Sequence, residues 1–167
     1  MEGAGRITCK QFLIDYKDQN SANYQRIIGF VEGYLTAANR YEPNTFDLSP
    51  WHNAFAFGLI LEKHCTGHPE DTLVSTLQRM VVSFRPIRLA KFSDLVEAGD
   101  GKTKVIVYDA ILRRAQAFLK QRGLYLGAED GVFTPALRDA FKKFQQEKGL
   151  TPSGLPDSAT LWTLLNP

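Results

Sequence analysis

The chain has 167 residues, of which 44% are hydrophobic and 23% are charged, and this length and composition fit one ordinary soluble domain or two small ones. With 20 basic and 18 acidic residues, the net charge of +2 excludes a strong overall attraction to nucleic acid or to an anionic membrane. No apolar run in the sequence approaches the roughly 20 residues that a membrane-spanning helix requires.

Apolar residues recur at helical spacing through residues 6–85 and predict a first domain of four helices. The first helix is expected over residues 9–17. The second begins beyond Asn23, follows a period near 3.6 and stops before Pro43.

Ser49 and Pro50 suit the N-cap and first position of a third helix that ends at Gly67. Its predicted buried face consists of Trp51, Ala54, Phe55, Gly58, Leu61 and Cys65. Pro69 suits the first position of a fourth helix, which continues to Phe84.

Residues 86–104 are rich in turn-forming residues and are predicted to be a linker between two domains. The β-branched run at residues 104–108 predicts a short strand or an extended tether. Because a single strand is not stable alone, we expect it to pair with another extended segment, such as residues 89–92, or to lie over a helix.

Residues 105–167 are predicted to form a second domain with three helices. Gly123 and Gly149 suit the ends of the first two helices, and Thr134 followed by Pro135 suits the start of the second. Asp157 is expected to cap the third. The predicted fold class is therefore mainly all-α, with two small helical domains and a short extended segment between them.

Two cysteines, Cys9 and Cys65, allow one intramolecular disulfide, which would close a loop that contributes on the order of 4 kcal/mol and would indicate an oxidising compartment. Two buried free thiols are the alternative. The first six residues lack the basic and apolar segments of a signal peptide. A secreted protein without its signal has the same appearance, and we expect a mature fragment with an added Met1.

The C-terminal region carries a set of residues with characteristic spacing, and it resembles the small three-helix peptidoglycan-binding domain of bacterial cell-wall enzymes and envelope proteins. The matching residues are Ala115-Gln116, Leu119, Gly123, Gly127, Asp130-Gly131, Phe133, Ala140, Phe144-Gln145, Gly149-Leu150, Gly154 and Thr160-Leu161. The resemblance implies a place at the cell wall. The sequence departs from the family, which commonly has Gly at the position of Thr134 and Thr at that of Leu137; we expect Thr134 to cap and Leu137 to pack.

The N-terminal region resembles a second family over residues 7–84, through Cys9-x-x-Phe12-Leu13, the Gly29-x-x-x-Gly33-Tyr34 run and Cys65 before His68-Pro69. It is similar to the periplasmic acid-stress chaperones of the HdeA family and to type VI secretion immunity proteins with the same disulfide-linked helical fold. The resemblance implies a disulfide between Cys9 and Cys65 and a periplasmic or secreted protein. It does not fix a function, because members of this family have unrelated roles.

Peptidoglycan stem peptides are short, extended and end in carboxylates, so a site for them would use helix N-termini, backbone N–H groups, a basic side chain and an aromatic wall. Asp130 and Gly131 form a turn dipeptide that would shape such a groove, although turn formation alone is the alternative role of Asp130. The candidate ligand-binding residues are Tyr125, Asp130, Phe133, Thr134, Arg138, Asp157 and Ser158.

Other chemistry has little support in the sequence. His64, Cys65 and His68 lack the further ligands of a zinc site, so no metal or cofactor is expected. The serines lie outside any nucleophile motif, no glycine-rich phosphate loop is present, and the carboxylates are spread along helix faces. We therefore expect no catalytic residues and no enzyme activity.

The sequence as a whole predicts a non-catalytic bacterial envelope protein. Its C-terminal domain is expected to bind peptidoglycan, through the stem peptide or the glycan, and its N-terminal domain to bind a protein partner or client. Nucleic acid and membrane insertion are not expected. The alternatives are an inhibitor or immunity protein against a cell-wall-degrading enzyme, and an accessory subunit of a wall hydrolase.

Overall fold

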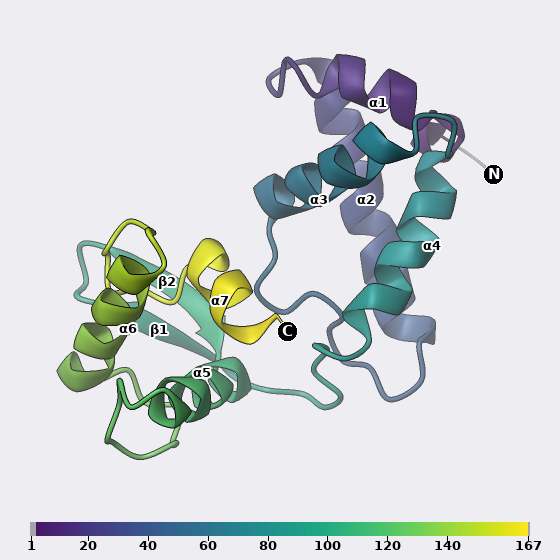
Figure 1. Cartoon of the computed structure of the whole chain (residues 1–167). Coiled ribbons are helices and arrows are strands. Elements are labelled where there is room, and N and C mark those ends of the chain that lie inside the picture. The colour runs from purple at the N-terminus through teal and green to yellow at the C-terminus, as the bar shows by residue number, and fades with distance from the viewer. Residues whose placement is uncertain (1–2, 167) are drawn as a thin grey trace. The chain divides into compact units, whose positions relative to one another are not determined.

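The computed structural model describes residues 3–166 and divides the chain into two compact units, Met1–Ala90 (unit 1) and Lys91–Pro167 (unit 2). Both units are small and mainly helical, as the sequence predicts (Figure 1). The division falls inside the predicted linker at residues 86–104. Within residues 3–166, every helix is too short or too polar to cross a lipid bilayer.

Unit 1 contains a 3-10 turn at Gly3–Arg6 and four α-helices: α1 (Cys9–Asp15), α2 (Ala22–Tyr41), α3 (Ala54–Gly67) and α4 (Leu73–Phe84). Each helix begins after a short polar side chain that accepts a hydrogen bond from a backbone N–H three residues on. These N-caps are Thr8, Ser21, Asn53 and Thr72.

A disulfide joins Cys9 at the start of α1 to Cys65 near the end of α3, and both residues are fully buried. The bond closes a loop of 56 residues in sequence separation, which in the chain-entropy model contributes about 4 kcal/mol to stability. Around it lies one apolar core, whose fully buried members include Phe12, Ile27, Val31, Leu61, Leu73 and Leu77. The predicted alternative of two free thiols is therefore wrong.

The predicted start of the third helix at Pro50 is wrong, because α3 begins at Ala54 with Asn53 as its cap. Before it, Asp47 and Leu89 exchange main-chain hydrogen bonds of 2.8 and 3.1 Å, and Pro50 lies in a turn closed by the His52 N–H, which donates to the Ser49 carbonyl at 3.0 Å. The later start also changes the buried face. Ala54 and Phe55 are exposed, and Phe57 is buried in their place.

The predicted start of the fourth helix at Pro69 is also wrong, since α4 begins at Leu73. The carbonyl of Pro69 accepts a hydrogen bond from the Lys10 N–H, and that of Asp71 accepts one from the Cys9 N–H, both at 2.8 Å. These are two of the N-terminal N–H groups of α1 that lack a partner within their own helix. The residues before α4 therefore satisfy α1 instead of extending α4.

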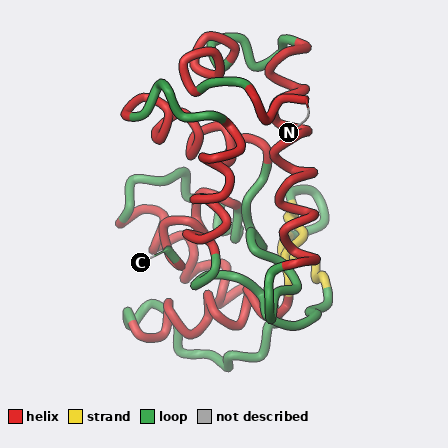
Figure 2. The backbone as a smooth tube through the Cα atoms, turned by 90° about the vertical axis from the view of Figure 1, so that its right-hand side faces the viewer, coloured by secondary structure: helices red, strands yellow, loops and turns green. Residues whose placement is uncertain are grey.

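Unit 2 opens with an antiparallel hairpin of β1 (Leu95–Gly99) and β2 (Lys104–Tyr108), shown as the yellow segments in Figure 2. The strand predicted at residues 104–108 is present, but its partner is β1. Residues 89–92 are not the partner, because Leu89 is already bonded to Asp47 in unit 1.

The hairpin is followed by three helices, α5 (Asp109–Gln121), α6 (Pro135–Glu147) and α7 (Ser158–Leu165). Their N-caps at Thr134 and Asp157 and the first helical position at Pro135 match the prediction. The core of unit 2 is apolar, and its fully buried members include Ile111, Leu112, Leu119, Leu137, Phe141 and Phe144.

We expect His52 to make unit 1 sensitive to acid. Its ring stacks against Trp51 and Phe57 and lies 4.6 Å from the Phe84 ring centre, and this burial lowers its pKa from 6.5 to about 4. The unfolded chain therefore binds a proton near pH 6.5, whereas the folded chain resists it until about pH 4.

We predict that unit 1 loses stability as the pH falls from 6.5 to 4, by about 3 kcal/mol at 1.36 kcal/mol for each pKa unit. His52→Phe keeps an aromatic ring and should abolish this part of the pH dependence. Urea unfolding at pH 7 and pH 4.5 measures both. An equal loss of stability in the variant and the wild type would show that other groups are responsible.

Candidate functional site

The turn at Asp130 and Gly131 is organised by a buried glutamine of α5. The fully buried Gln116 accepts a hydrogen bond from the Gly131 N–H at 2.8 Å and donates through Nε2 to Asp130 Oδ1 at 3.0 Å. The Val132 N–H and the Gln116 amide hydrogen-bond to the Asp130 carboxylate and hold its pKa below the usual value. Gly131 has φ +76°, and a Cβ there would come within 1.6 Å of Asp109 Oδ1, so the turn requires glycine.

A second buried glutamine, Gln145, organises the loop between α6 and α7 through hydrogen bonds of its side-chain amide. Gln145 accepts a hydrogen bond from the Gly154 N–H at 2.7 Å. Its Nε2 lies within 3.0 Å of Ser153 Oγ, the Leu155 carbonyl oxygen and Thr160 Oγ1. Because these groups are partly or fully buried, the carboxamide replaces the water they would otherwise bind.

The two arrangements repeat one pattern. In each, the glycine lies three residues before a helix N-cap, so the glutamine of one helix sets where the next helix begins. Thr134 Oγ1 accepts from the Leu137 N–H at 3.2 Å, and Asp157 Oδ1 accepts from the Thr160 N–H at 2.8 Å. The sequence showed the glutamines only as part of a family resemblance and did not predict this role. The signal was a glutamine on an otherwise apolar helix face, with a Gly-x-x-Thr or Gly-x-x-Asp run following it.

The two predicted aromatic residues do not form an open wall. Tyr125 is 4% exposed, and its hydroxyl lies over Gly127, where an added Cβ would come within 2.3 Å of it. Its ring therefore belongs to the packed interior. Phe133 is half-buried between the Asp130 turn and the cap at Thr134.

Of the predicted polar residues, Thr134 and Asp157 use side-chain oxygens as caps, and Ser158 is the half-buried first residue of α7. Leu137 is fully buried. The expectations that Thr134 caps and Leu137 packs are therefore confirmed, and the fold tolerates both departures from the family pattern.

Arg138 on α6 is engaged with the hairpin. Its Nη1 donates to Asp100 Oδ2 at 3.0 Å, while Asp100 Oδ1 accepts from the N–H groups of Lys102 and Thr103. The Thr103 N–H, and then Arg138, hold the pKa of Asp100 below its usual value. The aliphatic part of Arg138 also covers Gly154, where an added Cβ would lie 2.7 Å from Arg138 Cγ.

The contacts thus divide four of the predicted residues between two loops. Asp130 and Phe133 belong to the loop organised by Gln116, whereas Arg138 and Asp157 belong to the one organised by Gln145. Any carboxylate that approaches Arg138 meets a guanidinium already paired with Asp100, so binding there is a competition between two carboxylates.

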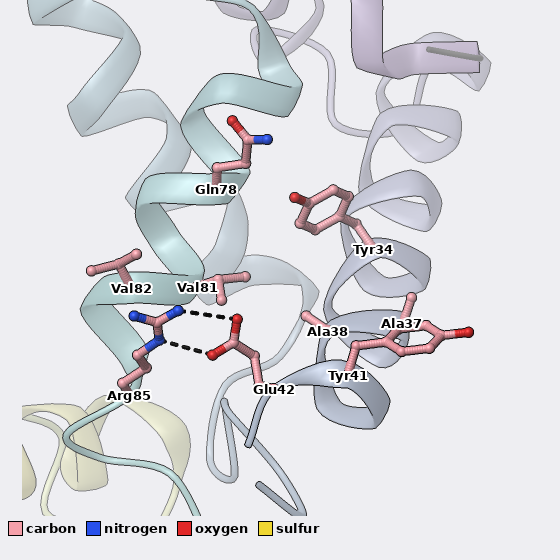
Figure 3. A pocket seen from close by; sticks show the side chains of 9 residues that line it. All are labelled: Tyr34, Ala37, Ala38, Tyr41, Glu42, Gln78, Val81, Val82 and Arg85. Atoms are coloured by element: carbon pink, nitrogen blue, oxygen red, sulfur yellow. Dashed lines mark hydrogen bonds and ion pairs between the residues drawn. The ribbon is translucent and has the colours of Figure 1, made fainter. Parts of the chain in front are cut away.

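Unit 1 has a groove that the sequence did not predict, with a volume of about 460 Å³ (Figure 3). It lies between α2 and α4. Figure 3 shows the Tyr34 hydroxyl facing α4 at one end, and at the other the bidentate pair of Glu42 and Arg85, with hydrogen bonds of 2.8 and 3.2 Å. The lining residues are Tyr34, Ala37, Ala38, Tyr41, Glu42, Gln78, Val81, Val82 and Arg85.

Exposed apolar side chains rim this groove. Tyr41 is 80% exposed and Val82 is 55% exposed. Such exposure next to a concave apolar surface is typical of sites that bind other molecules. The sequence did contain a signal, because the residues that line each wall of the groove are spaced at i, i+3, i+4 and i+7. The buried face of a helix has the same spacing, so the pattern alone cannot distinguish a groove from a core.

His64, Cys65 and His68 have structural roles, through a disulfide, a hydrogen bond and ring stacking. Cys65 is in the disulfide, His64 Nε2 lies 2.9 Å from Asp71 Oδ2, and the rings of His64 and His68 stack at 4.5 Å. The bond from His64 lowers the pKa of Asp71. This cluster stabilises the loop that also receives the N–H groups of α1.

Comparison with known proteins places the C-terminal site in context. The family described as "Putative peptidoglycan binding domain" matches residues 109–164, which contain α5, α6, both glutamine-organised loops and all of α7 except Leu165. This match supports the peptidoglycan-binding domain that the sequence predicts.

Two curated relatives are both named "Localization factor PodJL" and come from Caulobacter vibrioides, strains NA1000 / CB15N and ATCC 19089 / CIP 103742 / CB 15. Each is 37% identical over 86 residues, which is 52% of this chain. The aligned stretch covers 8% of the relative's length, so the chain spans only a small part of these proteins. No solved structure matches the chain.

We predict that Gln145→Leu destabilises unit 2 by about 3 kcal/mol, because it leaves buried partners such as the Gly154 N–H and the Leu155 carbonyl without hydrogen bonds. Gln146→Leu is the matched control, since its neighbouring side chain is exposed and should change stability by less than about 0.5 kcal/mol. Chemical denaturation followed by circular dichroism tests this. Similar losses in the two variants would contradict the proposed role.

Proposed function

We propose that the protein is a non-catalytic component of the bacterial envelope that binds peptidoglycan through unit 2 and a protein partner through unit 1. The observation that carries the first part is the family match over residues 109–164, together with a framework in which buried glutamines position two loops and two helix starts. Fixed loops with pre-positioned backbone groups suit the recognition of a short extended peptide.

The wall ligand is expected to meet unit 2 near Arg138, through a stem-peptide carboxylate. Arg138 is the predicted site residue with a charge suited to that group, and it lies beside the Gln145 loop. Asp100 holds the guanidinium in place and competes for it. Tyr125 has no part in this proposal, because its ring is buried. Asp130 has a structural role in it.

A location in the periplasm or outside the cell is part of the same proposal. It is supported by the Cys9–Cys65 disulfide, which is stable in an oxidising compartment, and by a ligand class found outside the cytoplasm. The proposed likeness of unit 1 to the HdeA family agrees with its four helices and its disulfide.

The partner surface of unit 1 is proposed to be the groove between α2 and α4. Its floor of Ala38 and Val81 is apolar, and its charged pair, Glu42 and Arg85, is internally neutralised. A groove of this kind favours an apolar segment of a protein over a charged ligand.

For the wall ligand, we predict that the full chain co-sediments with purified sacculi. The full chain is needed because a fragment that starts at residue 104 would lack β1. Arg138→Ala should weaken binding by about 1.5 to 3 kcal/mol, which is tenfold or more, since a charge-assisted hydrogen bond is lost. Asp100→Asn should strengthen binding, because the competing carboxylate is removed.

Lys143→Ala is the control, since it removes one exposed cation from the same helix and should have little effect. If Arg138→Ala and Asp100→Asn both bind like the wild type, the carboxylate site is not at Arg138. A folded chain that stays in the supernatant at every sacculus concentration would overturn wall binding and leave a protein-docking domain.

For the partner, we predict that Val82→Asp abolishes capture of an envelope protein from extract, because it places a charge on the rim of the apolar groove. Ile14→Asp is the matched control, since Ile14 is 56% exposed on α1 of the same unit. The captured bands should persist with Ile14→Asp. Bands that persist equally with Val82→Asp would exclude the groove.

A further inference from the structure

The hairpin of unit 2 has an outer strand edge that is open. The sheet has two strands, so β1 and β2 each have one neighbour within residues 3–166. The Asp109 N–H donates to the Asp94 carbonyl at 2.9 Å, and the Asp100 N–H donates to the Thr103 carbonyl at 3.3 Å. In an antiparallel ladder the hydrogen-bonded pairs alternate with pairs that are not bonded.

The bonded pairs at the two ends of the hairpin, Asp94–Asp109 and Asp100–Thr103, fix which of the pairs between them are hydrogen-bonded. Opposite Glu97, Ile106 occupies a pair that is not hydrogen-bonded, so its N–H and C=O point away from β1. Within residues 3–166 these two groups make no hydrogen bond outside the hairpin. The Ile106 side chain is 55% exposed. Backbone groups and an apolar side chain are thus available together at one position.

From this edge we infer that β2 pairs with β2 of a second copy of the chain, antiparallel about a twofold axis at Ile106. The two hairpins would then form one four-stranded sheet. In this register Ile106 lies opposite Ile106 of the other copy, and Lys104 lies opposite Tyr108. Ile106 and Lys104 direct both backbone groups away from β1, so the parity of the ladder is satisfied. Tyr108 would contribute its N–H alone, because it is the N-cap of α5 and an N-cap carbonyl accepts the first hydrogen bond of its helix.

Charge favours the β2 edge over the β1 edge. The equivalent symmetric pairing of β1 would place Glu97 opposite Glu97, and like charges directly opposite each other are destabilising. Pairing through β2 brings no like charges opposite each other. Lys104 is already paired with Glu97 of its own hairpin at 2.6 Å. Strand edges that avoid pairing usually carry several charges, a bulge or a proline, whereas β2 reads Lys-Val-Ile-Val-Tyr.

Such an interface is small, so association in free solution is expected to be weak. It becomes effective where copies are already held side by side. If unit 2 binds the wall, as proposed above, the high local concentration of copies would favour pairing and would raise the avidity of each pair for the wall.

The test uses the full chain without sacculi, so its outcome is independent of wall binding. Sedimentation equilibrium from about 10 µM to about 1 mM should show the average mass rising from 18.8 kDa towards twice that value. Ile106→Lys places two ammonium groups opposite each other across the axis and should keep the chain monomeric. Leu95→Lys is the matched control, because Leu95 is exposed on the same face of the hairpin but lies on β1.

Hydrogen exchange of the wild type provides a second measurement that needs no variant. The protection of the Ile106 amide should increase with protein concentration, in proportion to the paired fraction. The Glu97 amide, which points away from β2 at the other edge of the hairpin, should show no such increase. A mass of 18.8 kDa at all concentrations would overturn the inference. So would protection of Glu97 in place of Ile106, or equal loss of association in both lysine variants.

Discussion

The architecture of unit 2 depends on two buried carboxamides. A glutamine can donate and accept at once, so Gln116 and Gln145 each bind a glycine N–H through oxygen and carbonyl or side-chain oxygens through nitrogen. A charged or purely apolar side chain could not satisfy both kinds of partner. Because each glycine stands three residues before a helix cap, these bonds fix where α6 and α7 begin. The arrangement of the three helices, and of any groove between their loops, follows from this.

The same framework decides which groups remain for a ligand. The side-chain oxygens of Thr134 and Asp157 accept hydrogen bonds as helix caps, and the Tyr125 ring is buried in the core. Arg138 keeps its charge but shares it with Asp100 on the hairpin turn. The hairpin therefore has two roles in unit 2. Its turn holds the cation in position, and the outer edge of β2 presents backbone groups that a second copy would complete. A carboxylate ligand would thus act at the turn of this hairpin, and self-association at the edge of β2.

Unit 1 is organised by a different constraint. The disulfide and the hydrogen bonds from the start of α1 to the loop before α4 close the ends of the helices together, and the aromatic cluster around His52 fills the space near α4. The groove lies between α2 and α4, and its lining includes Tyr34 and Val82. A unit with a cross-linked core and an open apolar groove is suited to binding a partner without changing its own fold.

The sequence by itself determined the presence of the helices, the caps at Thr134 and Asp157, and the resemblance in residues 109–164, because apolar period, capping chemistry and spacing are local properties. Tertiary structure alone decided the starts of α3 and α4, the partner of β2, the burial of Tyr125 and the pairing of Arg138. In each case a distant backbone or side-chain group competed with the local preference. Pro50 and Pro69 suit a helix start, yet the chain around them bonds to Leu89 and to the first N–H groups of α1, and no local pattern records those partners.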